Sequence, residues 1–392
     1  MKIQSCLLFR LCLTVILFSQ LIDAHDVSAA TIRVEKDGSG DFTEIQPALN
    51  VVASGDTLLI GPGDFTESTE ISIEGYPEDV EVFANVTVAS LTIIGAGMDQ
   101  TIIGPSEPSG DSTSYTPKCL VWQYGSELNL DGLTFKNCYE GLHLVYGIVN
   151  INNCRILENY IGMIWLHEGD GGRIVNSEIT TSFLFSNGAT IFGSGGDLLF
   201  RNVTTNGGEI SIRSLSGIKF EDCVFEGGRL GVKLAIGAEA EIENCAIFGC
   251  SVGGIILDRA SCHIEYSEIS GNEVAVWVDL EGELTANNTI FSGGSFATVY
   301  SHMGVSISIN NSHILKGAGY SVFCNSYVPS GEGIFDMTNN YWNSTDSEEI
   351  ASWIWDSVQD PEGMVTVEYL PFSDQEVSAE KKSMGDFKTL FR

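Results

Sequence analysis

The sequence predicts an all-β fold, a solenoid in which short parallel strands stack coil upon coil. The first observation is a repeated phrase, seen as EIENCAIFGCSVGGIILD from Glu241 to Asp258, which recurs with a period near 22 residues from about Leu120 to Trp342. The second is the alternation of apolar and polar residues inside each unit, as in VAVWVDLEGELTANNTIF, which is the two-residue period of strands. The third is that Gly, Asn and Ser bends close each run. Helical repeats and leucine-rich repeats lack these patterns.

Each repeat is long enough for two or three strands of three to five residues, which make one coil. About ten coils at strand spacing form a rod of roughly 50 Å. We expect Asn244 to bond an equivalent side chain one coil away, and Cys245 to point into the core at a narrow turn. The same position as Asn244 is occupied by Asn137, Asn153, Asn176, Asn202, Asp222, Asn288 and Asn311.

The open ends of such a solenoid must be covered. Near the N-terminus, the segment from about Ile45 to Val52 predicts a short amphipathic helix. Near the C-terminus, STDSEEIASWIWDSV has a Thr or Asp cap followed by Glu, with Ile350, Trp353 and Ile354 on one face. We therefore expect a short capping helix at both ends.

The first 30 residues have the parts of a secretory signal: Lys2, an apolar run from about Cys6 to Ile22, and small residues ending at Ala30. We expect residues 1–30 to be a signal peptide, residues 31–372 to form the capped solenoid, and residues 373–392 to be a flexible tail. The protein is expected to be secreted or held at the cell surface.

The formal charge of −33 belongs to the segment after the signal. A field of that sign repels phosphate backbones and anionic lipid surfaces, so nucleic acid and membrane insertion are excluded as partners. A polysaccharide or a cell-surface glycan remains possible, and the oligomeric state is left open.

Eight of the 10 cysteines lie after the signal. An even number in an exported chain is compatible with disulfides. Four of the eight occupy the same place in the repeat, however, where cysteine behaves as a small buried apolar side chain. Their disulfide status is left open at this point.

Both ends of the predicted solenoid contain known motifs. The segment VEKDGSGDFTEIQPALN followed by GDTLLIGPGDFTE resembles the start of pectin methylesterases, and NNYWNSTDSEEIASWIWDSVQDPEGMVTVEYLPF is similar to the close of bacterial right-handed β-helix repeat proteins of the pectate-lyase-like superfamily. The resemblance covers about Thr31 to Phe372 and implies a right-handed parallel β-helix.

The resemblance does not extend to catalytic motifs. The segment ATIFG has Ala189 where pectin methylesterases have their catalytic Asp, and the Leu-Gly-Arg-Pro-Trp motif is absent. The motifs of polygalacturonases and of pectate lyases are absent too. The resemblance therefore implies a scaffold without assigning a reaction.

Aligning IGMIWLH, GGIILD and VAVWVD predicts one exposed face. A first outward row contains His143, Trp165, Ser211, Lys233, Ile256, Trp277, Val299 and Phe323. A second outward row contains His167, Arg213, Ala235, Asp258, Asp279, Ser301 and Asn325. Flat aromatic rings beside hydrogen-bonding groups suit sugar rings. We therefore expect Trp165, His167, Arg213, Lys233 and Trp277 to bind an extended glycan.

Asp258 and Asp279 would lie on adjacent coils about 5 Å apart. Two carboxylates at that distance could divide acid and base roles, which makes them the catalytic candidates if the protein is a polysaccharide lyase or glycoside hydrolase. They could equally share a calcium ion, or simply be solvated. A glycan-binding or surface-structural protein is favoured because the enzyme motifs are missing. An adhesin-like module acting through protein contacts is the third alternative.

Overall fold

The computed structural model describes residues 29–73, 76, 78–108, 117–123, 125–168, 171–181, 187–194, 197–325, 333–360 and 365–376. Within these ranges the side chains of 166–168, 187, 188, 190 and 192–194 are not described. The proposed signal peptide lies almost wholly outside the described residues, and so does most of the proposed tail. Neither helix in the described part of the chain is long and apolar enough to cross a membrane.

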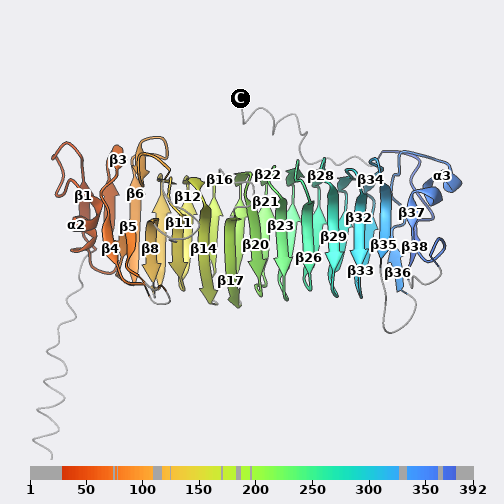
Figure 1. Cartoon of the computed structure of the whole chain (residues 1–392), viewed down its shortest axis with the longest axis horizontal. Helices are drawn as coiled ribbons and strands as arrows, with labels where there is room; N and C mark the ends of the chain where they lie inside the picture. Colours follow the sequence, from red (N-terminus) through yellow and green to blue (C-terminus); the bar gives the residue numbers. More distant parts are fainter. Residues whose placement is uncertain are drawn as a thin grey trace, which may run out of the picture.

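The chain forms a straight rod of three long sheets, which we call A, B and C, with sheet C facing the viewer in Figure 1. Every strand pair is parallel except β4 with β5, which is antiparallel. Successive coils contribute neighbouring strands to each sheet. The predicted parallel β-solenoid is thereby confirmed, with somewhat more coils than the ten expected, since the sheets have 11 to 14 strands in the described residues.

Sheet A has 14 strands. They are β1 (Thr31–Val34), β2 (Thr57–Ile60), β6 (Ser90–Gly95), β9 (Glu127–Asp131), β12 (Ile148–Asn152), β15 (Gly172–Val175), β18 (Leu198–Arg201), β21 (Ile218–Glu221), β24 (Glu239–Glu243), β27 (Ser261–Glu265), β30 (Glu283–Asn287), β33 (Ser306–Asn310), β36 (Gly333–Asp336) and β38 (Val365–Glu368).

Sheet B has 11 strands, most of three residues. They are β3 (Gly63–Phe65), β7 (Thr101–Ile103), β10 (Thr134–Lys136), β13 (Arg155–Asn159), β16 (Glu178–Thr181), β19 (Thr204–Asn206), β22 (Val224–Glu226), β25 (Ala246–Phe248), β28 (Glu268–Ser270), β31 (Ile290–Ser292) and β34 (His313–Leu315).

Sheet C has 13 strands. They are β4 (Thr69–Ile71), β5 (Val80–Val86), β8 (Lys118–Gln123), β11 (Glu140–Val145), β14 (Ile161–Glu168), β17 (Asn187–Ser194), β20 (Glu209–Arg213), β23 (Leu230–Ala235), β26 (Gly253–Asp258), β29 (Val274–Asp279), β32 (Ala297–His302), β35 (Tyr320–Asn325) and β37 (Ile354–Trp355).

Short helices cap both ends, as predicted (Figure 1). Helix α2 (Ile45–Leu49) buries Ile45, Ala48 and Leu49 against the first coil. At the other end, the side chain of Asp346 accepts hydrogen bonds from the backbone N–H groups of Glu348 and Glu349 and so caps α3 (Ser347–Ser352). Ile350 is fully buried at that end. One apolar core thus runs between two closed ends.

Two side-chain ladders join the coils at the turn between sheets A and B. The predicted outward ladder is present: Asn202 Nδ2 donates to Asn176 Oδ1 over 2.9 Å, and Asn244 Nδ2 donates to Asp222 Oδ1. The prediction was wrong for Asn137, which follows the sheet B strand β10 and so lies at the next corner of its coil. Residues of the ladder have φ near +50°, which Asn and Asp tolerate better than other non-glycine residues. The local sequence therefore specifies the corner of each coil.

The second ladder points into the core, one residue later in each coil. The backbone N–H of Cys245 donates to Ser267 Oγ (3.1 Å), that of Thr289 to Ser312 Oγ (3.1 Å), and that of Ser312 to Asn340 Oδ1 (2.9 Å). Cys223 N–H donates in the same way to Cys245 Sγ (3.4 Å). Ser, Thr and Cys suit this position for two reasons. Their side chains are small enough for the core, and they accept a hydrogen bond from a backbone N–H of the preceding coil.

Candidate functional site on the outer face of sheet C

The strand register of sheet C defines two rows of side chains on its outer face. The outer row contains Val121, His143, Ile164, Thr190, Ser211, Lys233, Ile256, Trp277, Tyr300, Phe323 and Trp355. Two residues later in each coil lies the edge row, with Arg213, Ala235, Asp258 and Asp279, and then with His302 and Asn325. Both rows run along the axis of the rod.

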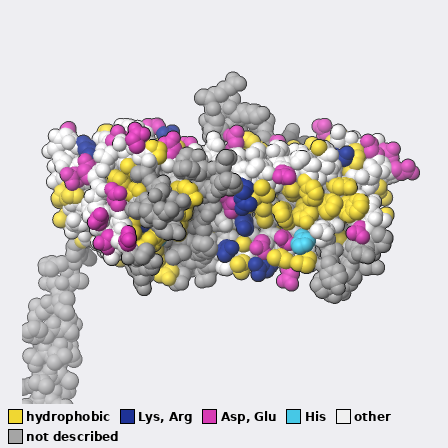
Figure 2. All heavy atoms as spheres, in the orientation of Figure 1, with side chains coloured by type: hydrophobic (Ala, Val, Ile, Leu, Met, Phe, Trp, Pro, Cys, Tyr) yellow, Lys and Arg dark blue, Asp and Glu magenta, His cyan; other side chains and the backbone are white. Residues whose placement is uncertain are grey.

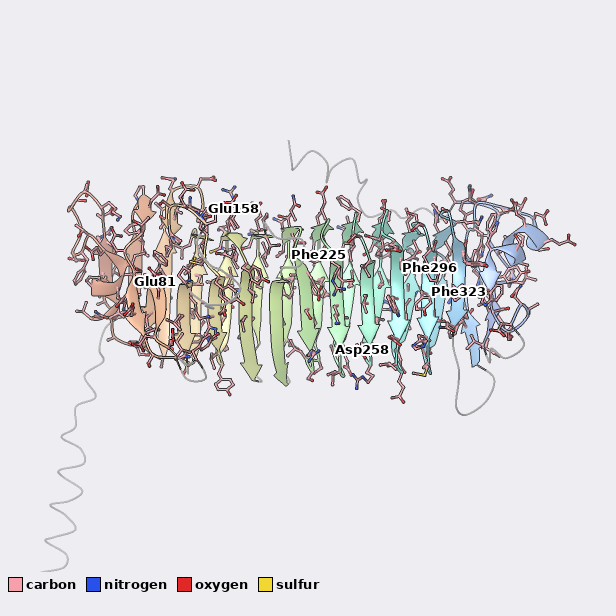
Figure 3. All side chains as sticks on the ribbon, viewed as in Figure 1. Glu81, Glu158, Phe225, Asp258, Phe296 and Phe323 are labelled. Atoms are coloured by element: carbon pink, nitrogen blue, oxygen red, sulfur yellow. The ribbon has the colours of Figure 1, made fainter. Side chains whose placement is uncertain are left out.

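An aromatic cluster occupies the C-terminal part of this face. It consists of Trp277, Phe296, Tyr300, Tyr320, Phe323 and Trp355. The rings of Tyr300, Phe323 and Trp355 stack on successive coils, with centroids 5.9 and 6.0 Å apart and interplanar angles of 18° and 9°. Phe296 is 42% exposed. Figure 2 shows hydrophobic side chains gathered over these strands, and Figure 3 shows Phe296 beside Phe323.

The edge row places polar groups alongside the aromatic cluster. Asp258 and Asp279 are register partners on adjacent coils, as expected. Asp258 Oδ1 accepts from Arg259 Nε over 3.1 Å, and Asp279 Oδ1 is 2.8 Å from His302 Nδ1. Both carboxylates remain partly exposed, with 27% and 24% of each side chain accessible. Asp258 lies at the edge of the sheet in Figure 3.

A basic cluster adjoins these rows on β20 and β23. Arg213 and Lys233 lie diagonally across adjacent strands, because Ser211 pairs with Lys233 and Arg213 with Ala235. Arg229, just before β23, lies 3.8 Å from Glu209 Oε2. Burial raises the pKa of Glu209, and the charges of Arg229 and Lys233 oppose that rise. In a chain with 19 basic and 52 acidic residues, this is a local concentration of basic side chains (Figure 2).

In the N-terminal part of the same face, Ile73 and Tyr76 from the connection between β4 and β5 pack against the sheet. Ile73, Val80, Val82 and Val121 form a small separate apolar core there. Beside it lies the covered cluster, which consists of Tyr76, Lys118, Glu140 and His143. Lys118 Nζ is 2.5 Å from Glu140 Oε1, and His143 Nδ1 is 2.8 Å from Glu140 Oε2.

Burial in this cluster is nearly complete, since the side chains of Lys118 and Glu140 are 0% and 1% exposed. The Tyr76 hydroxyl lies 3.1 Å from Lys118 Nζ and 3.2 Å from Glu140 Oε1. Burial lowers the pKa of Lys118 despite the opposing charge of Glu140. Burial alone would raise the pKa of Glu140, but the hydrogen bond with His143 and the charge of Lys118 bring it below its ordinary value.

The structure corrects the predicted position of Trp165. Its side chain is fully buried, and Ile164 takes its place in the outer row. The indole fits inside because Gly172 leaves room: a Cβ at that position would lie 2.3 Å from the Trp165 ring. Trp165 is therefore a core residue and not part of the exposed face.

Three further assignments differ from the alignment. Val299 is buried, and Tyr300 lies in the outer row in its place. Ser301 is also buried, and His302 lies in the edge row instead. The strand register places Leu166, and not His167, in line with Arg213 of the edge row, and the side chain of His167 lies outside the described residues. Arg213, Lys233 and Trp277 lie on the outer face of sheet C in the rows predicted for them, and whether they bind a ligand remains a prediction.

Sequence reasoning missed several members of the face, although a signal was available. Several sheet C strands have a small residue at their second position, as in Gly141, Gly162, Gly231, Gly254 and Ala275. A Cβ at Gly141 would lie 2.5 Å from the carbonyl oxygen of Gly162, so this position tolerates little beyond glycine. Aligning on that small residue places Tyr300 with Trp277, and His302 with Asp279.

A separate groove of about 630 Å³ lies on the outer face of sheet A. Its basic side chains already pair with carboxylates: Lys219 lies 3.0 Å from Glu221 and 3.7 Å from Glu241, and Arg201 also contacts Glu221. The two basic side chains are thus already paired, and the five carboxylates of the lining leave the groove with an excess of negative charge. This leaves the outer face of sheet C as the better candidate site.

Asp258 and Asp279 are also the pair for which the sequence allows a shared calcium ion. In the part of the chain that the structure describes, no group of three or more His, Cys, Asp or Glu side chains is arranged to hold a metal ion. One oxygen of Asp258 and one of Asp279 already have nitrogen partners.

Comparisons with known proteins were made for the whole chain. Residues 167–314 match the family model described as the right handed beta helix region. This match and the three-sheet solenoid confirm the right-handed sense that the resemblance implied. Among curated proteins, none matches the chain.

The solved structures that are similar to this chain include a mannuronan C-5 epimerase and a pectate lyase. The A-module of the mannuronan C-5 epimerase AlgE4 from Azotobacter vinelandii is 15% identical, with a TM-score of 0.45, over 82% of this chain and 89% of that one. Pectate lyase Pel9A is 15% identical, with a TM-score of 0.40, over 92% of this chain and 83% of that one.

Proposed function

We propose that this right-handed parallel β-helix protein is exported and binds an extended polysaccharide along the outer face of sheet C. The observation that supports this is the pair of parallel rows on β26 to β35. An apolar row of Trp277, Tyr300 and Phe323 runs beside a polar row of Asp279, His302 and Asn325. A sugar chain offers the same two surfaces, since its rings are apolar on their faces and carry hydroxyls at their edges.

The exposure of the aromatic cluster also favours a ligand. Six aromatic side chains on neighbouring coils form an apolar patch, which a protein leaves in contact with water mainly where it binds something. Successive coils each contribute aromatic side chains to the patch, so it extends along the rod axis. This geometry suits a linear chain better than a compact small molecule.

Substitution in the outer row tests the proposal. We expect Trp277→Ala and Tyr300→Ala each to weaken retention about tenfold on an immobilised panel of neutral and acidic polysaccharides, which corresponds to about 1.4 kcal/mol. The matched control is Tyr341→Ala, whose ring contacts His313 away from this face. Unchanged retention in both outer-row variants, with a folded circular dichroism spectrum, would refute glycan binding here.

A catalytic form of the site is the second candidate, because Asp258 and Asp279 are register partners and Asp279 is hydrogen-bonded to His302. In that case one carboxyl would act as acid and the other as base or nucleophile on the bound chain. Mass spectrometry of soluble products, with and without calcium, tests it. Oligosaccharides that disappear in Asp258→Asn would support an enzyme, and their absence in the wild-type protein would exclude one for the substrates used.

A further inference from the structure

Two of the eight cysteines after the signal differ from the others in what their sulfur atoms contact. Cys119 lies in β8 and Cys138 in the turn between β10 and β11, and their Sγ atoms are 2.6 Å apart. Unbonded heavy atoms attract each other best at roughly 3.5–4.0 Å. Both side chains are buried, with 0% and 2% exposed. In the structure they are thiols in close contact with no solvent between them.

The two side chains approach each other from different sides of the core. Residue 119 belongs to sheet C, whereas residue 138 follows the sheet B strand β10. Gly104 makes room at this point, because a Cβ there would lie 3.1 Å from Cys119 Sγ and 2.1 Å from the carbonyl oxygen of Lys136. Because the two side chains enter the core from different sides, their sulfur atoms point toward each other.

Cys223 and Cys245 provide the contrast. They lie one above the other on neighbouring coils, next to the register pair Val224 and Ala246. Side chains stacked in this way point in the same direction, with Cβ atoms near the strand spacing of about 4.8 Å, beyond the roughly 3.5–4.5 Å of a disulfide. Each thiol instead contacts a carbonyl oxygen two residues before it, Glu221 O at 3.2 Å and Glu243 O at 3.3 Å.

We propose that Cys119 and Cys138 form a disulfide when the chain folds in an oxidising environment, and that the remaining cysteines after the signal stay as thiols. Those remaining cysteines are Cys154, Cys223, Cys245, Cys250, Cys262 and Cys324. The cross-link would close a small loop within a single coil. It would tie β8 to the turn before β11.

The oxidant is a disulfide of low molecular weight or a disulfide-exchange protein. The thiolate of one cysteine attacks a sulfur of the oxidant, and a mixed disulfide forms as one thiol leaves. The second cysteine loses its proton and attacks the mixed disulfide, which releases the other thiol. Two S–H groups of the protein are thereby oxidised, and the oxidant is reduced to two thiols.

The disulfide would form during folding, while this coil still opens and exposes its thiols to the oxidant. Burial, followed by the hydrogen bond with Cys119, raises the pKa of the Cys138 thiol well above its ordinary value, so the folded protein contains little of the reactive thiolate. Once closed, the link would flank the covered cluster, because Lys118 precedes Cys119 and Glu140 is two residues beyond Cys138. It would therefore hold both members of the buried ion pair in place.

Peptide mapping of the full chain tests the proposal. The protein is refolded in a buffer of oxidised and reduced glutathione, unfolded without reductant, and alkylated with iodoacetamide before proteolysis and mass spectrometry. We expect a peptide pair linked through Cys119 and Cys138 that separates only after reduction, while the other six cysteines are alkylated at once. Alkylation of Cys119 and Cys138 without reduction, or a link between any other pair of the eight, would overturn the proposal.

Two variants sharpen the result. Cys138→Ser should leave Cys119 open to alkylation, whereas the matched control Cys223→Ser should leave the link intact. Reduction should lower the thermal midpoint of the wild-type protein and leave that of the double variant Cys119→Ser/Cys138→Ser unchanged. Because mapping of the wild-type protein decides on its own, a variant that fails to fold does not affect the test.

Discussion

The two ends of the outer face of sheet C use equivalent strand positions in opposite ways. Toward the N-terminus, the outer row and its neighbours hold ionisable side chains that are almost fully buried, among them Glu140 and His143. Toward the C-terminus, the same outer row holds Tyr300 and Phe323, which remain partly in contact with water. Ile73 and Tyr76, from the connection between β4 and β5, pack against the first region. Burial on this face depends on what covers the sheet more than on residue type.

This comparison separates stability from binding. A buried ion pair contributes to stability only if both partners are present, and it is strongly destabilising when one is lost. A partly exposed aromatic row adds little to folding beyond its own ring contacts, and its apolar surface is available to a ligand. We therefore expect changes in the covered region to affect unfolding, and changes in the open region to affect ligand retention.

The largest effect is expected for Glu140→Ala, which leaves Lys118 without its buried counter-charge. We expect the free energy of unfolding to fall by about 3–5 kcal/mol, measured by urea denaturation. The matched control is Glu241→Ala at the exposed pair with Lys219, where a loss of at most about 1 kcal/mol is expected. If both variants lost the same amount, the difference between the covered and open parts of the molecule would be unsupported.

A smaller effect is expected for Tyr76→Phe, which removes one hydroxyl from the covered cluster. The hydroxyl lies within hydrogen-bond distance of Lys118 and Glu140, so its loss should cost about 1–3 kcal/mol of unfolding free energy. Tyr369→Phe is the control, because that hydroxyl donates to Ser347 O at an exposed position. Equal effects in the two variants would mean that the cluster is not sealed from water.

The smallest effect is expected in the pH dependence of stability, where two glutamates of sheet C should act in opposite directions. The folded-state pKa of Glu140 lies below its unfolded value of 4.5, so its stabilising contribution is present above pH 4.5 and is lost as the pH falls through the folded-state pKa. The folded-state pKa of Glu209 lies above 4.5, so its contribution is present below that pH and is lost as the pH rises.

Urea denaturation at a series of pH values, with Glu140→Gln and Glu209→Gln, measures both contributions. Relative to the wild-type protein, the first variant should flatten the loss of stability on acidification, and the second should reduce the loss on going from pH 4.5 upward. Slopes changed in the same direction by both variants would show that Glu209 is as well paired as Glu140.

The sequence predicted the solenoid and its caps because the signals for them are local. Strand alternation, the Asn-containing corner and the Asp346 cap each depend on residues within a few positions of one another. The register of β14 was predicted wrongly for a related reason: Met163, Ile164 and Trp165 are all apolar, so alternation does not distinguish the inner from the outer side. The glycine at position 162 distinguishes them, because it is the second residue of its strand, as Gly141 and Gly231 are of theirs.

The covered cluster could not be found in this way. Tyr76 is 42 residues from Lys118 and 64 from Glu140 along the chain, and it reaches them from the connection between β4 and β5. In the sequence, Lys118 and Glu140 look like ordinary surface residues between strands. A contact that depends on an irregular insertion has no periodic signal.

The inward ladder of Ser, Thr and Cys side chains gives the rod a direction. From Cys223 to Asn340, the backbone N–H at this corner donates to a side chain of the following coil. Removing coils from the C-terminus would therefore leave a buried donor without an acceptor, whereas removing them from the N-terminus would leave only an unused acceptor. Each coil therefore completes the hydrogen bonding of the coil before it in the chain.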